Sequence, residues 1–535
     1  MFEIWRIRRS FVKKIFLRAI VFALFICISL SLCSCGASHG KDVVKIIDIP
    51  LTNEEYVFVA KKGNVALTES FNQFLDELKA SGEFDALMAK YFEGQGEKIG
   101  YPVSVGDVEN TAQVLIVATN CPFSPFEYLG EDGLIYGLDI EIAAAYAKAH
   151  NLELVIKNIG FDDIFTQITS GYADIGMAGI TASPDRAKNY EFTDGYYQAS
   201  QKLIVSADNS AFDGCKTAQD VEEILSSLEG VSIGYQSATT GSLYIKGDED
   251  WEFDGFENIG GKAYATALVA VSDLVNGNLY AVILDESPAL AIANAVNSQA
   301  GLNLLSKLEN FMQTLSSPHY SSVLWQGLVN TVQVAVLGLI IGILIGMLIA
   351  IVKVAPKYKL IYRILDKICT LYTLIFRGTP IVAQLLIAYY VIIPSMDIKV
   401  DALSVGCIVF GMNSGAYVSE IMRGGINSVD KGQLEAGRAL GLTYPTTMIK
   451  IVVPQAVKNI LPTLGNEFIS LIKETSVLSF IAVYDLYKSL VDVGMVNYDS
   501  MVPYLMMGVI YIVLVLIISA GIKLIERRFA KSDRN

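Results

Sequence analysis

Five apolar stretches in the C-terminal third of the chain constrain its fold most strongly. Each is at least as long as the roughly 20 residues that a helix needs to cross a bilayer. Charged side chains interrupt the third and fourth stretches, which makes these two the weakest. The stretches are Val323–Val352, Leu371–Ile393, Leu403–Met422, Leu464–Tyr484 and Pro503–Leu524. They predict an all-α membrane domain of five transmembrane helices over residues 323–524.

The loops between these stretches alternate in charge. The first loop, the third loop and the tail 525–535 are rich in Lys and Arg, whereas the second and fourth loops carry mainly Asp. Basic loops remain in the cytoplasm. The alternation therefore predicts a multi-pass membrane protein whose third loop, 430–460, and C-terminus are cytoplasmic. The residues before Val323 are then extracellular.

The N-terminus reads as an export signal. Lys and Arg residues precede an apolar run, Ala19–Leu32, that is shorter than a membrane span, which predicts a leader over residues 1–35. The segment Leu32-Cys33-Ser34-Cys35-Gly36 resembles a bacterial lipoprotein cleavage site, which implies lipidation of Cys35 in a bacterial plasma membrane. Plain cleavage and an uncleaved anchor remain as alternatives, and all three place the next residues outside the cytoplasm.

The block between the leader and the apolar stretches is acidic: residues 36–322 contain 16 Lys and Arg and 41 Asp and Glu, whereas the whole chain has a formal net charge of −14. Nucleic-acid binding needs a basic patch, which the block lacks. Of the seven cysteines, only Cys121 and Cys215 fall in the block, so we expect free thiols rather than a disulfide framework. With three histidines and no ligand spacing, we expect no metal site.

Short apolar runs in this block alternate with helical patterns, which predicts βα units and mainly parallel sheets. Such sheets bind ligands beyond the carboxyl ends of their strands. The segments at those ends contain no nucleophile–base pair and no phosphate loop, so we expect recognition rather than catalysis, and no cofactor. The predicted strands are Val114–Ala118, Leu152–Ile156, Ile175–Ala178, Val231–Gly234 and Tyr280–Leu284.

Arg186 is the most informative single residue. Ser183-Pro184-Asp185-Arg186 has the pattern of a helix N-cap, a proline at the first position and an acid in the first turn. A cation in that turn opposes the helix dipole, so Arg186 needs another partner. Arginine can hold a carboxylate through two hydrogen bonds. A surface pair with Asp185 or Asp174 is the alternative.

The third loop carries a recognisable motif. Glu435-Ala436-Gly437, three residues, Gly441, nine residues and then Ile451-Val-Val-Pro454 resemble the EAA loop of ABC importer permeases. Gly437 and Val453 depart from the family's Ala and Leu. We expect two short helices, the first ended by Gly441 and the second beginning near Pro445.

The resemblance implies that loop 430–460 docks on a separate cytoplasmic ABC ATPase dimer through Glu435, Ala436, Gly441 and Pro454. Segments such as Phe376-Arg-Gly-Thr-Pro380 resemble the polar amino acid subfamily. A permease of five spans is half a pore, so two copies or a paralogue are needed, and we expect a homodimer in membrane lipid, with a heterodimer as the alternative. The chain has no G-x-x-x-x-G-K-[ST] phosphate loop, which places ATP hydrolysis on another chain.

The segment Thr119–Tyr197 resembles the type II amino acid-binding proteins of ABC importers, for instance at Phe192-Thr-Asp-Gly-Tyr-Tyr197. This implies an α/β periplasmic-binding-protein fold of two lobes around an amino acid. By the resemblance, Arg186 holds the ligand's α-carboxylate with help from Thr239 and Thr240. The other implied ligand-binding residues are Asp285, Gly179 and Thr181 for the α-ammonium, Phe123 and Phe161 beside the side chain, and Asn120 and Gln236 at its polar end. Core packing is the alternative for Phe161, and Ala238 replaces the family's usual glycine.

The order of the pieces departs from the family. Residues 43–96 resemble the family's C-terminal segment, for instance at Phe71-Asn-Gln-Phe-Leu-Asp-Glu-Leu-Lys79. This predicts a circular permutation, with a joining linker over 97–113, a binding domain over 114–300 and a second linker over 301–322. The alternative is the remnant of a lost second binding domain, which would pack away from residues 110–200.

Taken together, the residues predict a non-enzymatic subunit of a polar amino acid ABC importer, with receptor and permease on one chain. An amino-acid-gated channel and a membrane-anchored sensor are the competing functions. A channel predicts a selectivity filter such as T-V-G-Y-G, which is absent. A sensor predicts a cytoplasmic signalling domain. Asn120 and Gln236 favour a neutral ligand such as glutamine, whereas Glu127 or Asp162 would serve a basic one.

Overall fold

The computed structural model describes residues 42–104, 113–248, 253–396, 398 and 400–531 of the chain. The chain forms two compact units. The α/β unit contains residues 35–323 together with 489–504, and the helical unit contains 324–488 and 505–535. The predicted leader and the proposed lipidation site, Cys35, lie outside the described residues.

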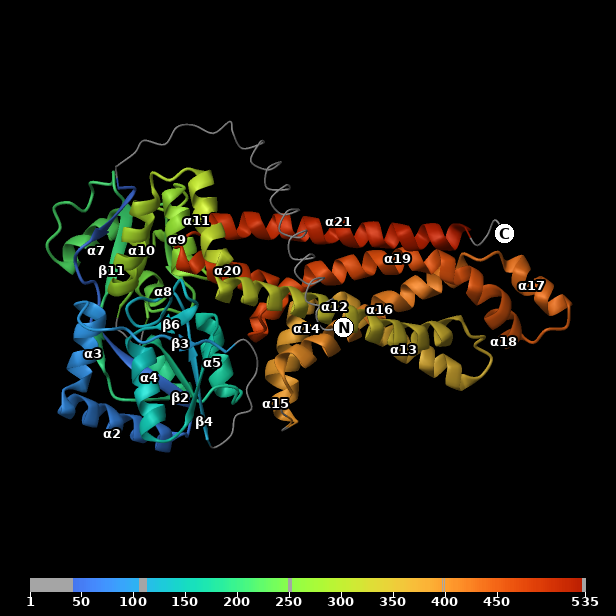
Figure 1. Ribbon diagram of the computed structural model, residues 1–535, viewed down its shortest axis with the longest axis horizontal. Coiled ribbons are helices and arrows are strands. Elements are labelled where there is room, and N and C mark those ends of the chain that lie inside the picture. Colours follow the sequence, from blue (N-terminus) through green and yellow to red (C-terminus); the bar gives the residue numbers. More distant parts are fainter. Residues whose placement is uncertain (1–41, 105–112, 249–252, 397, 399, 532–535) are drawn as a thin grey trace. The chain divides into compact units, whose positions relative to one another are not determined.

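Lobe I of the α/β unit is built on a sheet in the order β10-β2-β8-β4-β7, with β9 pairing β2. Strands β4, β7 and β8 are parallel, and β2 joins them antiparallel. Figure 1 labels strands β2 and β4 and helices α2, α3, α4 and α5 of this lobe. The strands are β2 (Glu54–Lys61), β4 (Val114–Thr119), β7 (Glu153–Asn158), β8 (Ile175–Thr181), β9 (Tyr190–Phe192) and β10 (Tyr197–Ala199). The helices are α2 (Val65–Ser81), α3 (Glu83–Phe92), α4 (Leu138–Ala149), α5 (Phe161–Thr169) and α6 (Pro184–Asn189).

Lobe II is built on a sheet in the order β1-β11-β14-β12-β13. Strands β12, β13 and β14 are parallel, and β1 and β11 pair antiparallel. The strands are β1 (Val44–Ile47), β11 (Gln201–Ser206), β12 (Val231–Gln236), β13 (Ile259–Tyr264) and β14 (Ala281–Asp285). The helices are α7 (Ala218–Ser227), α8 (Gly241–Lys246), α9 (Ala267–Val275) and α10 (Glu286–Gln299).

All five predicted strands are present, as β4, β7, β8, β12 and β14. The bonds among them are parallel, as expected. The expectation of mainly parallel sheets was incomplete, because β1, β2 and β11 add antiparallel pairs that the sequence patterns did not predict. The predicted two-lobed α/β architecture, joined to a helical unit, is confirmed.

Residues 54–92 of the N-terminal segment are an integral part of lobe I, whereas β1 belongs to lobe II. Strand β2 pairs with β8, and the helices of the segment bury Phe71 and Tyr91 in the same core as Phe126. The rings of Phe71 and Tyr146 stack with centroids 3.6 Å apart. A remnant packed away from residues 110–200 is therefore excluded, and the packing is the one that a circular permutation requires.

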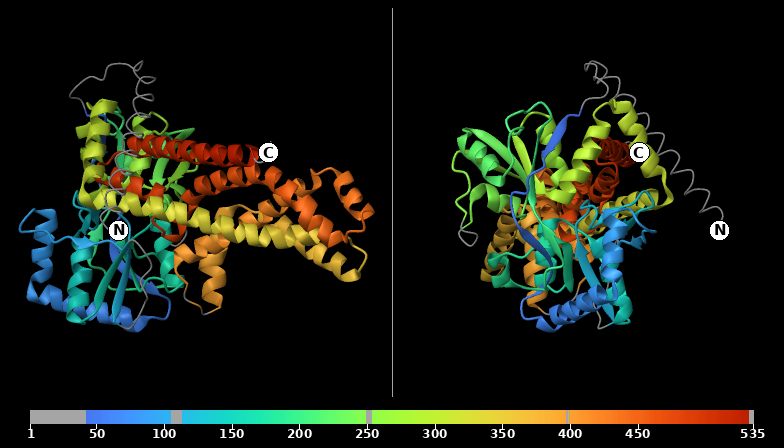
Figure 2. Two further views of the ribbon diagram at one scale, coloured as in Figure 1. Left: turned by 45° about the vertical axis from the view of Figure 1, so that its right-hand side comes forward. Right: turned by 90° about the vertical axis from the view of Figure 1, so that its left-hand side faces the viewer.

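The chain crosses between the lobes near Thr52 and again at Ser200. The two crossings run side by side, because the Leu51 amide donates to the Gln201 carbonyl and the Gln201 amide donates to Thr52 Oγ1, both at 2.9 Å. Figure 2 shows the dark blue N-terminal segment passing from the green lobe into the blue and cyan lobe. These paired crossings have the placement of a hinge.

Neither predicted linker is unstructured throughout. Within 97–113, β3 (Tyr101–Pro102) pairs with β6 (Leu134–Tyr136), which also pairs with β5 (Tyr128–Leu129). The expected linker 301–322 is largely helical, since it contains α11 (Leu304–Ser316) and the start of α12. Its helix buries Phe311 and Leu315, four residues apart on one face, and Asn303 caps its first turn.

The helical unit follows the predicted order of apolar segments with different boundaries. Its elements are α12 (Pro318–Val354), α13 (Leu360–Gly378), α14 (Ile381–Ile387), η2 (Ala388–Ile392), α15 (Ile393–Ser395), α16 (Ala402–Asn427), α17 (Lys431–Ala439), α18 (Tyr444–Thr447), η3 (Met448–Val452), α19 (Val453–Glu474), η4 (Thr475–Ile481) and most of α21 (Met501–Lys531). Most of α20 (Leu486–Val496), which follows η4 in the chain, belongs to the α/β unit. In the described residues, three helices are long and apolar enough to cross a membrane, namely Pro318–Val354, Ala402–Asn427 and Met501–Glu526.

Two predicted spans differ in the structure. Leu371–Ile393 is not one straight helix, because the segments Leu360–Gly378 and Ile381–Ser395 meet at a bend of 104° and would count as a fourth span only as a broken pair. Pro380 lacks an amide hydrogen and holds Thr379 in an extended conformation, which ends the first helix. Leu464–Tyr484 is not among the candidate spans, since α19 gives way to the 3₁₀ turn η4 after Glu474.

The third loop forms the two predicted helices. Helix α17 ends before Gly441, whose φ of 84° is the left-handed conformation expected after a helix. Pro445 lies in the first turn of α18, which Thr443 caps. Gly437, which departs from the family motif, is a site of close packing: a Cβ there would lie 2.5 Å from Thr447 Cγ2.

Candidate functional site: a cavity between the two lobes

A cavity of about 320 Å³ lies between the two lobes, its opening to solvent included. Its lining comes from strand ends and helix starts of both lobes. All the ligand-binding residues predicted from the sequence line this cavity, together with Ala178. The lining residues are Asn120, Phe123, Phe161, Ala178, Gly179, Thr181, Arg186, Gln236, Thr239, Thr240 and Asp285.

Arg186 turns inward from the first turn of α6. The Ser183 hydroxyl caps that turn by accepting from the Arg186 amide at 3.2 Å. The guanidinium donates to the Thr181 carbonyl at 2.7 Å and to the Ala238 carbonyl of lobe II at 2.6 Å. The rings of Phe161 and Phe165 lie 5.9 and 5.1 Å from its centre. Among the described residues, Arg186 does not form the alternative surface pair with Asp185. Its side chain lines the cavity instead, where a guanidinium can bind an anion.

Asp285 provides the opposite charge at the end of β14. It is buried, and the Tyr56 hydroxyl of lobe I donates to its Oδ1 at 2.7 Å. Burial raises the pKa of the Asp285 carboxyl, and the nearby Glu54 carboxylate raises it further. The cavity therefore contains one guanidinium and one carboxyl group, which is the arrangement that a zwitterion needs.

Glu54 is a functional candidate that sequence reasoning missed. It is the first residue of β2, only 4% exposed. Its carboxylate accepts hydrogen bonds from Thr181 Oγ1 at 2.6 Å and from Thr240 Oγ1 at 2.8 Å. The sequence did contain a sign of this role. Glu54 and Glu55 begin a buried strand, and because side chains of a strand alternate between its two faces, one of the two must point inward.

The threonines near Arg186 are oriented in a way that the sequence did not predict. Thr239 Oγ1 donates to the Gln236 carbonyl at 2.7 Å, and Thr240 Oγ1 donates to Glu54. A hydroxyl has a single hydrogen to donate. Neither hydroxyl hydrogen is therefore available to a ligand carboxylate in this conformation, which differs from the help expected of these two residues.

Asn120 and Gln236 meet across the cavity. Gln236 Nε2 donates to Asn120 Oδ1 at 3.1 Å, and Asn120 Nδ2 donates to the Ile159 carbonyl at 2.6 Å. Beside them, Ser237 Oγ donates to Asp162 Oδ2 at 2.9 Å. The Gln236–Asn120 and Ser237–Asp162 bonds join lobe II to lobe I, so the structure presents the closed form of the cavity.

Gly179 can only be glycine. Its φ is 53°, and a Cβ would lie 2.4 Å from Cε1 of Phe123. Its amide donates to Asp139 Oδ2 at 3.3 Å, which directs the amide away from the cavity. Ala238 also adopts a left-handed conformation, with φ of 56°. The alanine that replaces the family's usual glycine therefore adopts this conformation at the cost of local strain.

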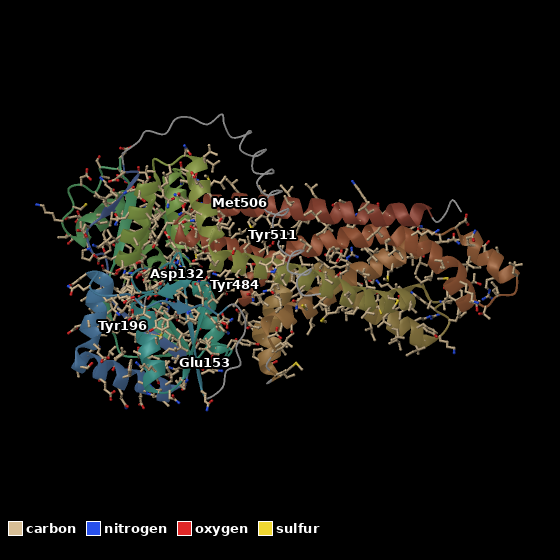
Figure 3. The ribbon with its side chains drawn as sticks, in the orientation of Figure 1. Asp132, Glu153, Tyr196, Tyr484, Met506 and Tyr511 are labelled. Carbon is tan, nitrogen blue, oxygen red and sulfur yellow. The ribbon has the colours of Figure 1, made fainter. Side chains whose placement is uncertain are left out.

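Two further buried acids lie behind the cavity. Asp139 accepts a hydrogen bond of 2.6 Å from the hydroxyl of Tyr196. Figure 3 labels Tyr196. Burial raises the pKa of the Asp139 carboxyl to about 7. Glu127 is completely buried, and within the described part of the chain neither of its carboxyl oxygens has a hydrogen-bond partner. Burial raises the pKa of Glu127 well above its usual range. Glu127 does not line the cavity, so its predicted role beside a basic ligand lacks a geometric basis.

In the helical unit, the predicted coupling residues lie in loop 430–460. Glu435 and Ala436 are exposed on α17, Gly441 forms the turn that follows, and Pro454 is exposed in the first turn of α19. Leu440 and Ile449 are also exposed beside them. The loop thus presents a mixed polar and apolar surface.

Comparisons with known proteins bear on the helical unit first. The family described as "Binding-protein-dependent transport system inner membrane component" matches residues 325–531. The chain is 37% identical over 208 residues to the "Arginine transport system permease protein ArtQ" of Bacillus subtilis, covering 39% of this chain and 93% of that protein. The present chain therefore belongs to this family of inner membrane permeases.

Other relatives have related names. A "Putative glutamine transport system permease protein GlnP" of Rickettsia bellii is 44% identical over 161 residues, covering 30% of this chain and 74% of that protein. The "L-cystine transport system permease protein TcyB" of Bacillus subtilis is 39% identical over 160 residues, covering 30% of this chain and 68% of that protein. These relatives are transport permeases rather than enzymes, and the predicted permease is confirmed.

Two solved structures are similar to parts of the chain. "Crystal structure of an amino acid ABC transporter with histidines" covers 40% of this chain and 97% of that chain, at 37% identity and a TM-score of 0.37. "Structure of holo ArgBP from T. maritima" covers 35% of this chain and 75% of that chain, at 27% identity and a TM-score of 0.29. The chain combines the permease with the α/β unit described above.

Proposed function

We propose that this chain is a subunit of an amino acid ABC importer that captures a polar amino acid outside the bacterial plasma membrane and passes it through its own helical unit. A separate cytoplasmic ATPase dimer drives the transport. The observation that carries the proposal is the single cavity that unites Arg186, Asp285, two phenylalanines and two amides. This set matches the groups of an α-amino acid.

Each part of the ligand has a complementary group in the cavity. The guanidinium of Arg186 takes the α-carboxylate. The Asp285 carboxylate, the Gly179 carbonyl and Thr181 Oγ1 take the α-ammonium. Phe123 and Phe161 then flank the ligand side chain, so that Phe161 serves the cavity rather than the core alone.

A polar amino acid is the class that fits the far end of the cavity. Asn120 and Gln236 offer amide groups to a neutral polar side chain. Asp162, the alternative partner for a basic side chain, accepts a hydrogen bond from Ser237 and does not line the cavity. The relatives named for arginine, glutamine and cystine support the same class.

The helical unit supplies the pathway. A second copy completes the pore, and residues Glu435, Ala436, Gly441 and Pro454 contact the ATPase from the cytoplasmic side. The α/β unit is extracellular, and the C-terminus is cytoplasmic. Lipidation of Cys35 would hold the N-terminus at the outer face of the membrane.

Calorimetry of the purified full chain in lipid nanodiscs, titrated with each of the twenty amino acids, tests the proposal. We expect one or a few polar amino acids to bind with a stoichiometry of one per chain. A chain that binds none of the twenty contradicts the proposal. In planar bilayers, a current gated by amino acid without ATPase would instead favour the channel.

A further inference from the structure

The carboxylate of Glu54 lies where the two lobes meet, directly after a crossing segment. It is held by three hydroxyl groups. Besides Thr181 of lobe I and Thr240 of lobe II, Thr52 Oγ1 donates to Glu54 Oε1 at 2.7 Å. A buried carboxylate only accepts hydrogen bonds, so the hydrogens of all three hydroxyls point toward it.

These hydrogen bonds to Glu54 determine whether two of the threonines, which line the cavity, can donate or accept a hydrogen bond there. Thr181 Oγ1 has donated its only hydrogen, and only its lone pairs remain for a ligand. Thr240 Oγ1 has likewise donated its hydrogen, and it also accepts from Gln201 Nε2 at 2.9 Å. Both oxygens are therefore acceptors toward the cavity and cannot donate to a ligand.

The neighbouring groups have the same polarity. The Asp285 carboxylate accepts, and the Gly179 amide is directed to Asp139, which leaves the Gly179 carbonyl as the group available to the cavity. This side of the cavity is a surface of acceptors with a net negative charge. A group that binds there must donate several hydrogen bonds and carry a positive charge, which a protonated primary amine does.

We propose that Glu54 is a positioning residue that makes the cavity specific for a protonated primary α-amine, because it holds the Thr181 and Thr240 hydroxyls as acceptors. The inference rests on the proposed function and deepens it. Glu54 acts through these two threonines and does not itself line the cavity. It couples this orientation to closure, since its two threonines come from different lobes.

The electrostatics of the site agree with the geometry. The charge of Glu54 raises the pKa of the Asp285 carboxyl beyond the effect of burial. Burial lowers the pKa of Arg186, and the charges of Glu54 and Asp285 oppose that shift. Because Arg186 pairs with the ligand carboxylate, the carboxylates of Glu54 and Asp285 make the other side of the cavity negative when they are ionised, which favours a cationic group such as an α-ammonium there.

The test compares Glu54→Gln with the control Glu55→Gln, which removes the neighbouring exposed charge. The probes are L-glutamine and L-arginine, with their N-α-acetyl derivatives, titrated by calorimetry against the full chain in nanodiscs. We expect Glu54→Gln to weaken the binding of the free amino acid by about 10- to 100-fold. The weak binding of the acetyl derivative, which lacks the charged amine, changes little, and Glu55→Gln stays within about threefold of the parent.

A second pair of variants shows whether Glu54 acts through Thr181. Thr181→Val removes the acceptor oxygen, and Thr181→Ser keeps it. We expect Thr181→Val to lose about tenfold in affinity and Thr181→Ser to lose little. In the Glu54→Gln background, Thr181→Val should cost less than in the parent, because the oriented acceptor is already lost.

The outcomes separate this inference from the proposed function. If the parent binds none of the twenty amino acids, the proposed ligand class fails and the inference fails with it. If the parent binds one of them and Glu54→Gln binds it within threefold, the proposed function stands and this inference is overturned. If Glu54→Gln does not fold, the Thr181 variants decide: equal affinities for Thr181→Val and Thr181→Ser overturn the inference.

Discussion

The α/β unit and the helical unit differ in the side chains that they leave exposed. The α/β unit places large aromatic rings in its core and lines its cavity with Arg186 and Asp285. The helical unit leaves large aliphatic side chains on its outside: Leu348, Leu374 and Leu516 are 64%, 68% and 63% exposed. Such exposure is unfavourable in water and neutral in lipid. The contrast shows that each unit is built for a different solvent.

The interior of the helical unit follows the rules of a lipid-embedded bundle. Gly338, Gly342 and Gly346 recur every four residues on α12 and face α16 closely, since a Cβ at Gly342 would lie 2.8 Å from the Cβ of Ser414. Ser414 in turn donates to Glu467 at 2.9 Å. Small residues and interhelical hydrogen bonds thus bring these helices close together beside buried apolar side chains such as Phe410 and Leu478.

The largest expected effect separates the units by function. Arg186→Met removes the guanidinium from the cavity and leaves the helical unit intact. We expect amino acid affinity to fall by more than about 100-fold, because a charged pair of hydrogen bonds is lost. Calorimetry of the full chain measures the loss, with Lys188→Met on the same helix as control. Equal losses in both variants would show that Arg186 does not contact the ligand.

The next effect concerns folding in lipid. Gly342→Leu places a large side chain where α12 and α16 touch, and we expect destabilisation by about 3 kcal/mol, seen as a lower thermal unfolding temperature in detergent. Gly508→Leu is the matched control, since no atom lies within 4 Å of the Cβ position at Gly508 on α21. If both leucines are tolerated alike, α12 and α16 do not pack as described.

A pH-dependent effect distinguishes the buried acids of the α/β unit. Burial keeps Glu127 protonated in the folded state, whereas it ionises near its ordinary pKa when unfolded. The folded state therefore loses stability as pH rises above about 4.5, by up to about 1.4 kcal/mol per pH unit, until the folded-state pKa is reached.

Glu127→Gln abolishes this titration. We expect the free energy of unfolding of the variant, relative to that of the parent, to rise by about 2 kcal/mol between pH 4 and pH 7. Thermal unfolding of the full chain at each pH measures this difference. Glu131→Gln, which changes a nearby exposed acid, serves as control. A stability difference that is constant across this pH range would mean that Glu127 ionises in the folded protein.

The smallest effect tests whether the N-terminal segment belongs to lobe I. The Tyr91 hydroxyl donates to Glu141 Oε1 at 2.5 Å, and Lys90 pairs with the same carboxylate at 2.8 Å. Tyr91→Phe should destabilise the α/β unit by about 1 kcal/mol, with Tyr358→Phe, an exposed site, as control. An unchanged unfolding temperature for Tyr91→Phe would argue that residues 43–96 are not part of the lobe.

The sequence predicted the cavity well because its residues follow strands. Asn120, Gly179, Thr181 and Asp285 end or follow apolar runs that are visible by eye, and short motifs mark Arg186. Glu54 was missed because its partners Thr181 and Thr240 are 127 and 186 residues away. Hydropathy reports burial, and it carries no information on which distant chain segments meet.

The helical boundaries were harder to predict for a related reason. Averaging hydropathy over a window of residues does not show that Pro380 interrupts the hydrogen bonds of the helix. For this reason Leu371–Ile393 was predicted as one continuous helix. Helix α11 was overlooked although Phe311 and Leu315 have helical spacing, because its exposed polar side chains resemble a linker.

ATP-dependent uptake in proteoliposomes tests the central claim most directly. The full chain is reconstituted with its ATPase, ATP is supplied on the ATPase side, and the labelled amino acid that binds in calorimetry is added on the receptor side. The account predicts accumulation above the external concentration that requires both ATP and an intact Arg186. Accumulation without the ATPase, or equal accumulation by Arg186→Met, would contradict it.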